Sequence, residues 1–459
     1  MTFSPLDSAL LGPLFTTADM AQCFSDTARV GAMLAAEAAL ARAQSGLGLV
    51  PGGLTDAIEA IPAESLGLAA LGAATAVSGV PTIPFIAAVQ KRLPPELAPS
   101  FHKGATTQDI LDTALVLQLR PALALVAADL DAVLTGLAVL ADAHRATPCV
   151  GRTYGQHAAP VTFGYKAAVW LTGVGDSAAA LPALRSRLLV ASLGGPVGMP
   201  TAFGAQGPAV LEAFARELGL GTTPLAWHTL RGRMAEAGAW VLHMLGALAK
   251  LATDVASLAS TDIGEVAEPY VPGRGGSSAM PHKRNPVSST VILAAHGAAK
   301  GLALTLFDAM AAAHERPAGA WHAEWHALPS LFGLLAGALR EARALAEGLQ
   351  VDAGRMLGNM DLTRGLLFAD AAAACLAPKL GRAGAHAAVE QAADKVRRSG
   401  ATLQTVLKSE YPAMPELLQV FELAPGVGAA GPWIDRALDH AGRVRSGLAG
   451  SADTVAGQP

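Results

Sequence analysis

The sequence predicts an all-α protein of three helical domains, the central one a long five-helix bundle. Hydrophobic residues make up 52% of the 459 residues but aromatic residues only 5%, so alanine, leucine and valine supply most of the apolar mass. Alanine and leucine favour helices, and β-branched residues, which favour strands, are comparatively scarce. Long alanine-rich stretches whose apolar residues recur every three or four positions are typical of a helix bundle.

The expected helices follow in order along the chain. An amphipathic helix at 24–44 has Ser25 or Asp26 placed to cap it, and a turn-rich segment continues to residue 104. The long helices come next, and they are expected at 109–144, 161–189, 234–263, 287–314 and 329–349. We therefore divide the chain into an N-terminal domain, a central bundle and a C-terminal domain, with boundaries at 1–104, 105–350 and 351–459.

The charge and cysteine patterns argue against several classes of protein. The chain has 33 basic and 37 acidic residues, a net charge of −4, and no basic block that would predict nucleic-acid binding. The uncharged stretches 65–90 and 188–211 contain prolines and glycines, unlike the unbroken apolar helix of about 20 residues that a membrane span needs. The N-terminus lacks a secretory signal, and the 3 cysteines have neither metal nor disulfide spacing. We therefore expect a cytoplasmic protein without membrane or nucleic-acid partners.

The segment 272–286, PGRGGSSAMPHKRNP, is the strongest candidate for a catalytic loop, and we call it the glycine-serine loop. Gly275 and Gly276 allow backbone N–H groups to approach an anion closely. The segment does not match a phosphate-binding loop, which ends in Gly-Lys-Ser/Thr, or a nucleophile elbow, which needs glycine where Ala279 stands. From its composition alone, a solvated surface loop is an equally good interpretation.

Three segments resemble the shared regions of the fumarase/aspartase superfamily of β-elimination enzymes. GSSAMPHKRNP, within the glycine-serine loop, is similar to the superfamily's signature loop. GATTQD at 104–109 is similar to its first shared region, and GRTYGQHAAPVTFG at 151–164 to its second. The resemblance implies three all-α domains, with the central five-helix bundles of four chains joined in a homotetramer whose active sites are shared between subunits.

Other segments resemble one branch of the superfamily, the enzymes that lactonise 3-carboxy-cis,cis-muconate in protocatechuate breakdown, the β-ketoadipate pathway. They are the opening FTTADMAQCFSDTARVGAMLAAEAALARAQSGLGLVP, WHTLRGR at 227–233 and HERPAGAWHAEWHALP at 314–329. The resemblance implies a cycloisomerase, an isomerase that acts as an intramolecular lyase.

Two alternatives stay open. Adenylosuccinate lyases resemble the chain as well, but they carry a histidine where this chain has Tyr154. They also carry serines suited to a nucleotide phosphate where this chain has Pro317, Ala318 and Gly319. A non-catalytic structural protein of this fold, as among lens crystallins, is the second alternative. The presence of Ser277, Lys283 and Asn285 argues against it.

The chemistry of lactonisation needs charge and one proton from the protein. A substrate carboxylate oxygen adds across a conjugated double bond, a doubly charged aci-carboxylate forms, and a proton reaches the carbon beside another carboxylate. Fixed donors and cations must face this developing charge. Because the nucleophile belongs to the substrate, a small tricarboxylate, we expect no cofactor and no metal.

The resemblance implies a role for each candidate residue. Ser277 would donate the proton, with Lys283 and backbone amides favouring its ionised form. His157 is the candidate for a second proton-handling group, although a purely structural histidine fits its position equally well. The other site residues would bind the substrate, and they are Thr106, Thr107, Gln108, Arg152, Gln156, Ser278, Arg284 and Asn285.

Overall fold

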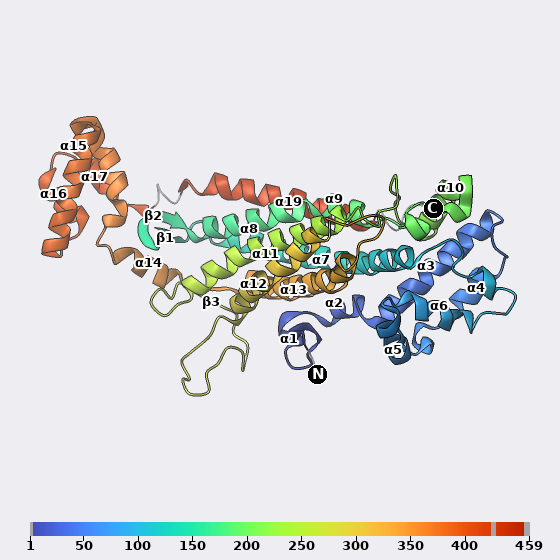
Figure 1. The fold of residues 1–459 in the computed structure, drawn as a ribbon. Helices are drawn as coiled ribbons and strands as arrows, with labels where there is room; N and C mark the ends of the chain where they lie inside the picture. The colour runs from blue at the N-terminus through green and yellow to red at the C-terminus, as the bar shows by residue number, and fades with distance from the viewer. Residues whose placement is uncertain (1–2, 424–427, 454–459) are drawn as a thin grey trace.

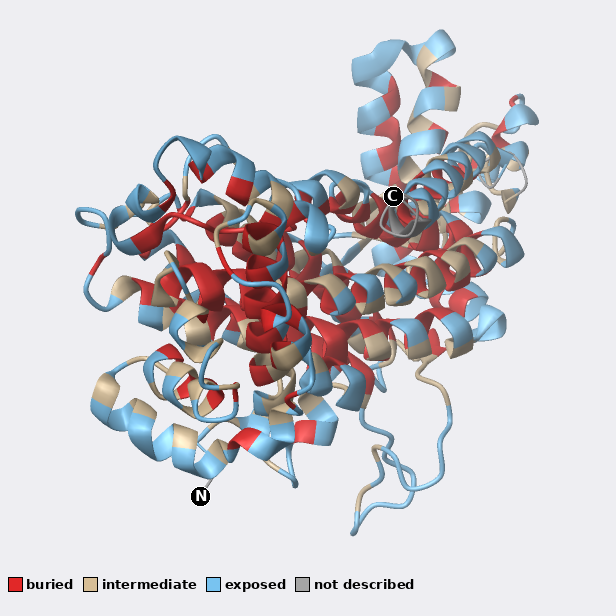
Figure 2. Cartoon of the chain, turned by 90° about the vertical axis from the view of Figure 1, so that its right-hand side faces the viewer, coloured by how far each residue is buried: buried red, intermediate tan, exposed pale blue. Residues whose placement is uncertain are grey.

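The computed structural model describes residues 3–423 and 428–453, and its helices confirm the all-α prediction (Figure 1). The five long helices of an elongated bundle are α7 (Thr107–Ala143), α8 (Phe163–Ala179), α11 (Gly232–Leu258), α12 (Val287–Asp308) and α13 (Ala320–Gly348). One continuous hydrophobic core runs between them, in which Leu130, Val241 and Leu335 are fully buried. Figure 2 shows the buried residues concentrated inside the bundle and the exposed residues around it.

Proline explains where two helices depart from the prediction. The last long helix was expected to begin at Pro329, but α13 begins at Ala320 and continues through this proline. A proline removes a single backbone N–H, and the packing of a long helix can offset that loss. The stretch 161–189 is divided at Ala180 into α8 and α9 (Leu181–Leu188), and Pro182 lies in the first turn of α9, where no N–H partner is lost.

The N-terminal region packs its longest helix against the bundle. Ser25 caps α3 (Asp26–Gly46), and its Oγ accepts the backbone N–H of Ala28 at 3.1 Å, in agreement with the predicted cap. α3 lies against α7 and shares the main core. Short helices replace the turns expected before residue 104, and they are α4 (Leu54–Glu59), α5 (Leu68–Ser78) and α6 (Thr82–Gln90).

The remaining short elements cover the ends of the bundle. The α-helices among them are α1 (Gly12–Phe15), α2 (Ala18–Cys23) and α10 (Gly207–Glu217). The 3-10 turns are η1 (Pro5–Asp7), η2 (Ala63–Leu66), η3 (Ala98–Ser100), η4 (Gly195–Val197), η5 (Thr201–Gln206) and η6 (Leu366–Phe368).

Two small antiparallel sheets, which the sequence analysis did not predict, lie at one end of the bundle. β1 (Pro148–Thr153) pairs with β2 (Gln156–Thr162). The turn between them has positive φ at Tyr154 (51°) and Gly155 (76°), the conformation of a tight two-residue hairpin. The second sheet pairs β3 (Val266–Ala267) with β4 (Gln350–Val351), and it joins the start of the glycine-serine loop region to the end of α13.

The C-terminal region has two parts. α14 (Ala353–Asp361) leads into a separate small core formed by α15 (Ala369–Ser399), α16 (Leu403–Glu410) and α17 (Glu416–Gln419), which lies beyond the β1–β2 hairpin (Figure 1). α19 (Gly431–Asp453) instead returns along α8, and Ile434 belongs to the main core. The structure therefore differs from the predicted C-terminal domain 351–459, because the apolar face of its last helix packs on the central bundle.

Four helical stretches of the described chain are long and apolar enough to cross a membrane, judged by length and composition alone. They are Thr107–Ala143, Phe163–Leu188, Gly232–Leu258 and Val287–Asp308. Each of them packs against another helix of the bundle, so part of its apolar surface faces the protein core.

Candidate active site

The glycine-serine loop leaves the bundle between β3 and α12 and projects away from it (Figure 1). The outgoing and returning segments of the loop meet where the backbone N–H of Asn285 donates to the carbonyl of Gly275 at 2.9 Å. Gly275 has a φ of +68°, and a Cβ at this position would lie 2.6 Å from the carbonyl oxygen of Asn285. Glycine is therefore required at Gly275 for the loop to close.

Two acidic residues that the sequence analysis did not single out fix the base of this loop. The carboxylate of Glu268 accepts the backbone N–H groups of Ser288 and Ser289, both at 2.9 Å, at the start of α12. Glu341, on α13, accepts the hydroxyl of Ser288 at 2.7 Å and forms an ion pair with Arg274. No local pattern in the sequence indicates these contacts, because the partners come from distant segments.

Ser277 lies near the tip of the loop in a local environment of backbone donors. Its Oγ accepts the N–H groups of Ala279 at 3.4 Å and Met280 at 3.2 Å. Amide donors of this kind stabilise a negative charge on oxygen, so they favour the ionised form of the hydroxyl. Lys283 is exposed near the same tip, and its backbone N–H donates to Met280 at 3.1 Å.

The neighbouring predicted site residues of the loop are exposed. Ser278, Arg284 and Asn285 all face solvent along part of their surface. The guanidinium of Arg284 lies over the ring of Tyr270 at 5.0 Å, a cation–π contact that leaves its N–H donors available. The tip of the loop therefore combines two hydroxyls with amide donors and positive charge.

The second region, on the β1–β2 hairpin, places one predicted residue in a structural role. Arg152 forms an ion pair with Glu265 at 2.5 Å, and this glutamate is fully buried and also accepts the amide of Asn359 at 2.8 Å. Arg152 thereby fixes the hairpin to the segment before β3, and its charge is already matched. These contacts favour a structural role for Arg152 over the expected role in binding substrate.

His157 lies opposite Arg152 in the hairpin and is half-buried. Burial, followed by the nearby charge of Arg152, lowers the pKa of His157 below its ordinary value of 6.5. Its Nδ1 is buried and has no hydrogen-bond partner within the described residues. A neutral imidazole with a free nitrogen can accept a proton at pH 7. Gln156, the preceding residue, is exposed at the start of β2.

The first region lies at the opposite end of the bundle. Thr106 and Thr107 stand at the start of α7, whose 37 residues separate them from the hairpin by about 55 Å at 1.5 Å per residue. The hydroxyl of Thr106 accepts a hydrogen bond from Arg316 at 3.0 Å. Arg316 is exposed, and the sequence analysis did not include it among the site residues.

Gln108 is fully buried rather than open to a ligand. Its amide nitrogen donates to the carbonyl of His228 at 2.8 Å, and its amide oxygen accepts from Arg316 at 3.1 Å. These contacts assign it a positioning role: it orients the Arg316 guanidinium beside Thr106.

Behind the first region lies a buried network of charged groups. Asp109 accepts the backbone N–H groups of Gly194 and Gly195 at 2.7 and 2.9 Å, the N–H of Thr106 at 2.9 Å and the His228 ring at 2.7 Å. The carboxylate therefore holds the start of α7 against the 192–207 loop.

Arg231 forms the second part of this network. It forms ion pairs with Asp112 at 2.8 Å and with Glu324, and all three side chains are almost completely buried. Burial alone would lower the pKa of Arg231, but the two carboxylates outweigh it and raise the pKa. The segments 227–233 and 314–329, which the sequence analysis treated as markers of one branch, meet in this cluster.

The structure thus brings the glycine-serine loop and the hairpin to the same end of the bundle and leaves the first region at the other (Figure 1). One chain does not assemble all three regions into a single site. Among the described residues, no group of three histidine, cysteine, aspartate or glutamate side chains is placed to hold a metal ion.

Comparisons with known proteins agree with this architecture. The model of a family described as lyase matches residues 19–301, more than half of the chain. The chain belongs to this lyase family. A 3-carboxy-cis,cis-muconate cycloisomerase of Pseudomonas aeruginosa is 44% identical over 438 residues, which cover 94% of this chain and 95% of that protein.

Two further relatives match this chain over nearly its whole length. The crystal structure of a 3-carboxy-cis,cis-muconate lactonizing enzyme from Pseudomonas putida superposes with a TM-score of 0.91 at 43% identity, covering 95% of this chain and 100% of that chain. A nitrosuccinate lyase of Streptomyces davaonensis is 42% identical over 450 residues, covering 94% of this chain and 95% of that protein.

Proposed function

We propose that this protein lactonises 3-carboxy-cis,cis-muconate to 4-carboxymuconolactone during protocatechuate breakdown in the cytoplasm. The observation that carries the proposal is the Ser277 hydroxyl, which two backbone N–H groups approach at the tip of a loop where the Lys283 side chain forms no ion pair with the described residues. This is the arrangement needed to move a proton beside a carboxylate. The similarity to cycloisomerases over nearly the whole chain supports the choice of substrate.

The proposed reaction proceeds in two steps. A carboxylate oxygen of the substrate adds to the conjugated double bond, the C–O bond forms, and the electron pair moves into the neighbouring carboxylate to give an aci-carboxylate. Lys283, Arg284 and Asn285 stabilise the second negative charge. Ser277 then donates its proton to the carbon beside that carboxylate, and the hydroxyl recovers a proton from solvent. No cofactor or metal takes part in these steps.

We further propose a homotetramer in which each site combines regions from different chains. The length of α7 supports this arrangement, because Thr106 and Thr107 cannot reach the loop of their own chain. The outer face of α12 supports it too, since Leu304 is 63% exposed and Phe307 48% exposed on a helix with few charged residues. Exposed apolar faces of this kind are typical of subunit interfaces. Sedimentation should give the mass of four chains, and an active monomer would contradict this proposal.

Elimination of nitrite from nitrosuccinate is the second candidate function, favoured by the 42% identity to a nitrosuccinate lyase. Both reactions involve a carbanion beside a carboxylate, so the loop chemistry does not separate them. Parallel assays with 3-carboxy-cis,cis-muconate, nitrosuccinate and adenylosuccinate test the choice. We expect turnover of the first alone. Comparable turnover of either other compound would overturn the substrate assignment while leaving the loop chemistry intact.

A further inference from the structure

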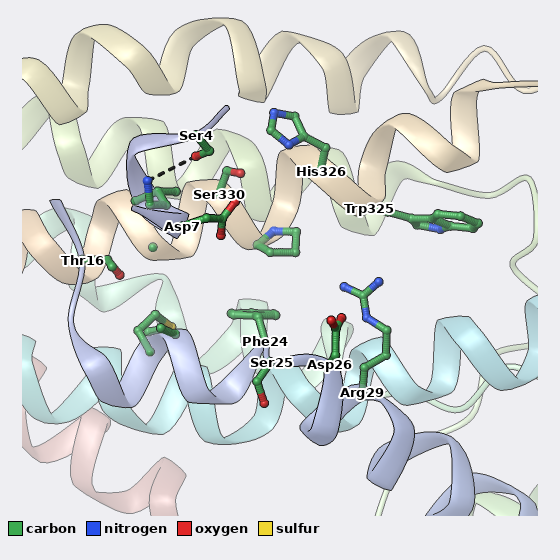
Figure 3. A pocket seen from close by; sticks show the side chains of 15 residues that line it. Ser4, Asp7, Thr16, Phe24, Ser25, Asp26, Arg29, Trp325, His326 and Ser330 are labelled. Carbon is green, nitrogen blue, oxygen red and sulfur yellow. Dashed lines mark hydrogen bonds between the residues drawn. The ribbon is translucent and has the colours of Figure 1, made fainter. Parts of the chain in front are cut away.

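We propose that a cavity between the N-terminal segment and α13 binds a small aromatic acid with one carboxylate and a hydroxyl at the opposite end of its ring. The cavity has a volume of about 340 Å³ and includes none of the predicted site residues (Figure 3). Arg29 and Asp26 lie at one end and Thr16 and Asp7 at the other, while Phe24 lies between them on one side and Ser330 and His326 of α13 on the other. This division indicates the chemistry of the ligand.

Arg29 forms the anion-binding end. It lies in the first turns of α3, half-buried, and its guanidinium has no hydrogen bond or ion pair within the described part of the chain. Burial lowers the pKa of Arg29, and the charge of Asp26 offsets this only in part. Figure 3 shows both side chains reaching toward the helix that carries Trp325. A planar carboxylate matches the two parallel donors of an unpartnered guanidinium.

Thr16 and Asp7 form the other polar end (Figure 3). The hydroxyl of Thr16 is buried, at 8% exposure, and it has no hydrogen-bond partner among the described residues. A buried hydroxyl in this state is destabilising until something supplies the missing hydrogen bond. A ligand hydroxyl can accept from Thr16 while it donates to the Asp7 carboxylate.

The walls between the two ends fit a flat ring. Phe24 lies between them in Figure 3, and Met20 and Pro329 add apolar surface to the lining. Trp325, beside Arg29, is held by an edge-to-face contact with Trp321 at 4.9 Å and 81°. An aromatic body buries more area against such walls than a flexible chain and loses less conformational entropy.

The charges of the lining select against the substrate of the proposed function. Asp7 and Asp26 provide two negative charges against the single positive charge of Arg29. Asp26 lies beside Arg29 and offsets part of its charge, so this end can match one carboxylate at most. The second carboxylate of a tricarboxylate would extend toward Asp7, where repulsion would weaken its binding. The expected ligand therefore carries one carboxylate, and this inference does not depend on the proposed lactonisation.

Calorimetric titration of the full-length protein tests the site with three probes: 4-hydroxybenzoate, benzoate and p-cresol. We expect saturable binding of 4-hydroxybenzoate, weaker binding of benzoate, and no binding of p-cresol, which lacks the carboxylate. Arg29→Gln should raise the Kd for 4-hydroxybenzoate at least about tenfold, since it removes a charge-assisted pair. Arg42→Gln is the matched control, because Arg42 lies on the same helix but pairs with Glu59 and Glu217 outside the cavity.

Thr16→Val tests the other end and keeps the proposal decidable if Arg29→Gln does not fold. The valine has the same shape, and the lost hydroxyl has no partner, so thermal stability should not fall. This variant should weaken 4-hydroxybenzoate several-fold and leave benzoate unchanged. Three results would overturn the proposal: no saturable binding by the wild type, unchanged binding by Arg29→Gln, or equal losses for both probes in Thr16→Val.

Discussion

The first-region end of the helix bundle and the tip of the glycine-serine loop treat their charged residues in opposite ways. At the first-region end, Asp109 accepts four hydrogen bonds, and Arg231 is enclosed by two buried carboxylates. At the loop end, the side chains of Ser278 and Lys283 make no hydrogen bond or ion pair with other described residues. Both ends contain segments that resemble shared regions of one superfamily.

This contrast separates residues that hold the fold from residues that are free to meet a ligand. A charge that is already paired inside the protein stabilises the fold only if both partners remain, and it has little capacity left for substrate. An exposed cation on a loop adds little stability, but it can still neutralise charge that develops during a reaction. Substitutions at the first end should therefore change stability, and substitutions at the loop tip should change turnover.

The largest effect is expected for Arg231→Met, which leaves Asp112 and Glu324 buried without a counter-ion. Removing one member of a buried ion pair typically costs about 3 to 5 kcal/mol of the free energy of unfolding. Urea unfolding followed by circular dichroism measures the loss. Arg187→Met is the control, because Arg187 pairs with Glu236 on the surface and should change stability far less. Equal losses in the two variants would show that the buried pairs of Arg231 stabilise the fold no more than an exposed pair does.

Ser277→Ala should have the opposite profile, a large loss of activity with unchanged stability. General acid–base groups contribute about 10²- to 10⁴-fold, so kcat should fall at least about a hundredfold while KM changes little. The melting temperature should stay constant, since the side chain lies on a projecting loop. Steady-state kinetics with 3-carboxy-cis,cis-muconate provides the measurement. A variant with near-normal kcat would move the proton-donor role elsewhere, with His157 as the first candidate.

The pH dependence of His157→Gln tests whether the hairpin shares in the chemistry. Burial and Arg152 lower the pKa of His157 below 6.5. At pH values between this lowered pKa and 6.5, the imidazole is neutral in the folded protein but protonated in the unfolded chain. Its contribution to stability is therefore complete above pH 6.5 and is lost as the pH falls through the lower, folded-state pKa. If neutral His157 handles a proton, kcat/KM should decline only below pH 6.5, and His157→Gln should abolish that decline. An unchanged profile in the variant would leave His157 with a structural role only.

The sequence predicted the long helices because they depend on local patterns, whereas the backbone donors to Ser277 are those of Ala279 and Met280 and not the expected glycines. Apolar residues three or four positions apart define the bundle helices, and Ser25 was recognisable as a helix cap. The left-handed conformation of Gly275 follows from a paired-glycine motif, although Gly276 has no such conformation. The β1–β2 hairpin was missed, because its short strands carry no alternating apolar pattern.

The roles of Arg152 and Gln108 could not be read from the sequence, because they depend on partners more than 100 residues away. Arg152 pairs with Glu265, and Gln108 bonds to the carbonyl of His228. Residue type predicts that such side chains bind something, but only the tertiary structure decides whether the partner is a ligand or the protein itself. Arg316 was missed for the same reason, since its position beside Thr106 arises from long-range packing.

Ser278→Ala should have the smallest effect, and it sharpens the comparison at the scale of two adjacent residues. Ser277 accepts two backbone N–H groups, whereas the Ser278 hydroxyl makes no contact of this kind with the described residues. Without donors that favour its ionised form, Ser278 can give the substrate only one ordinary hydrogen bond. Loss of one such bond, worth about 0.5 to 1.5 kcal/mol, predicts a fall in kcat/KM of no more than about tenfold. The variant is measured beside Ser277→Ala under the same conditions. A larger loss for Ser278→Ala than for Ser277→Ala would mean that substrate binding rearranges the loop tip and exchanges the roles of the two hydroxyls.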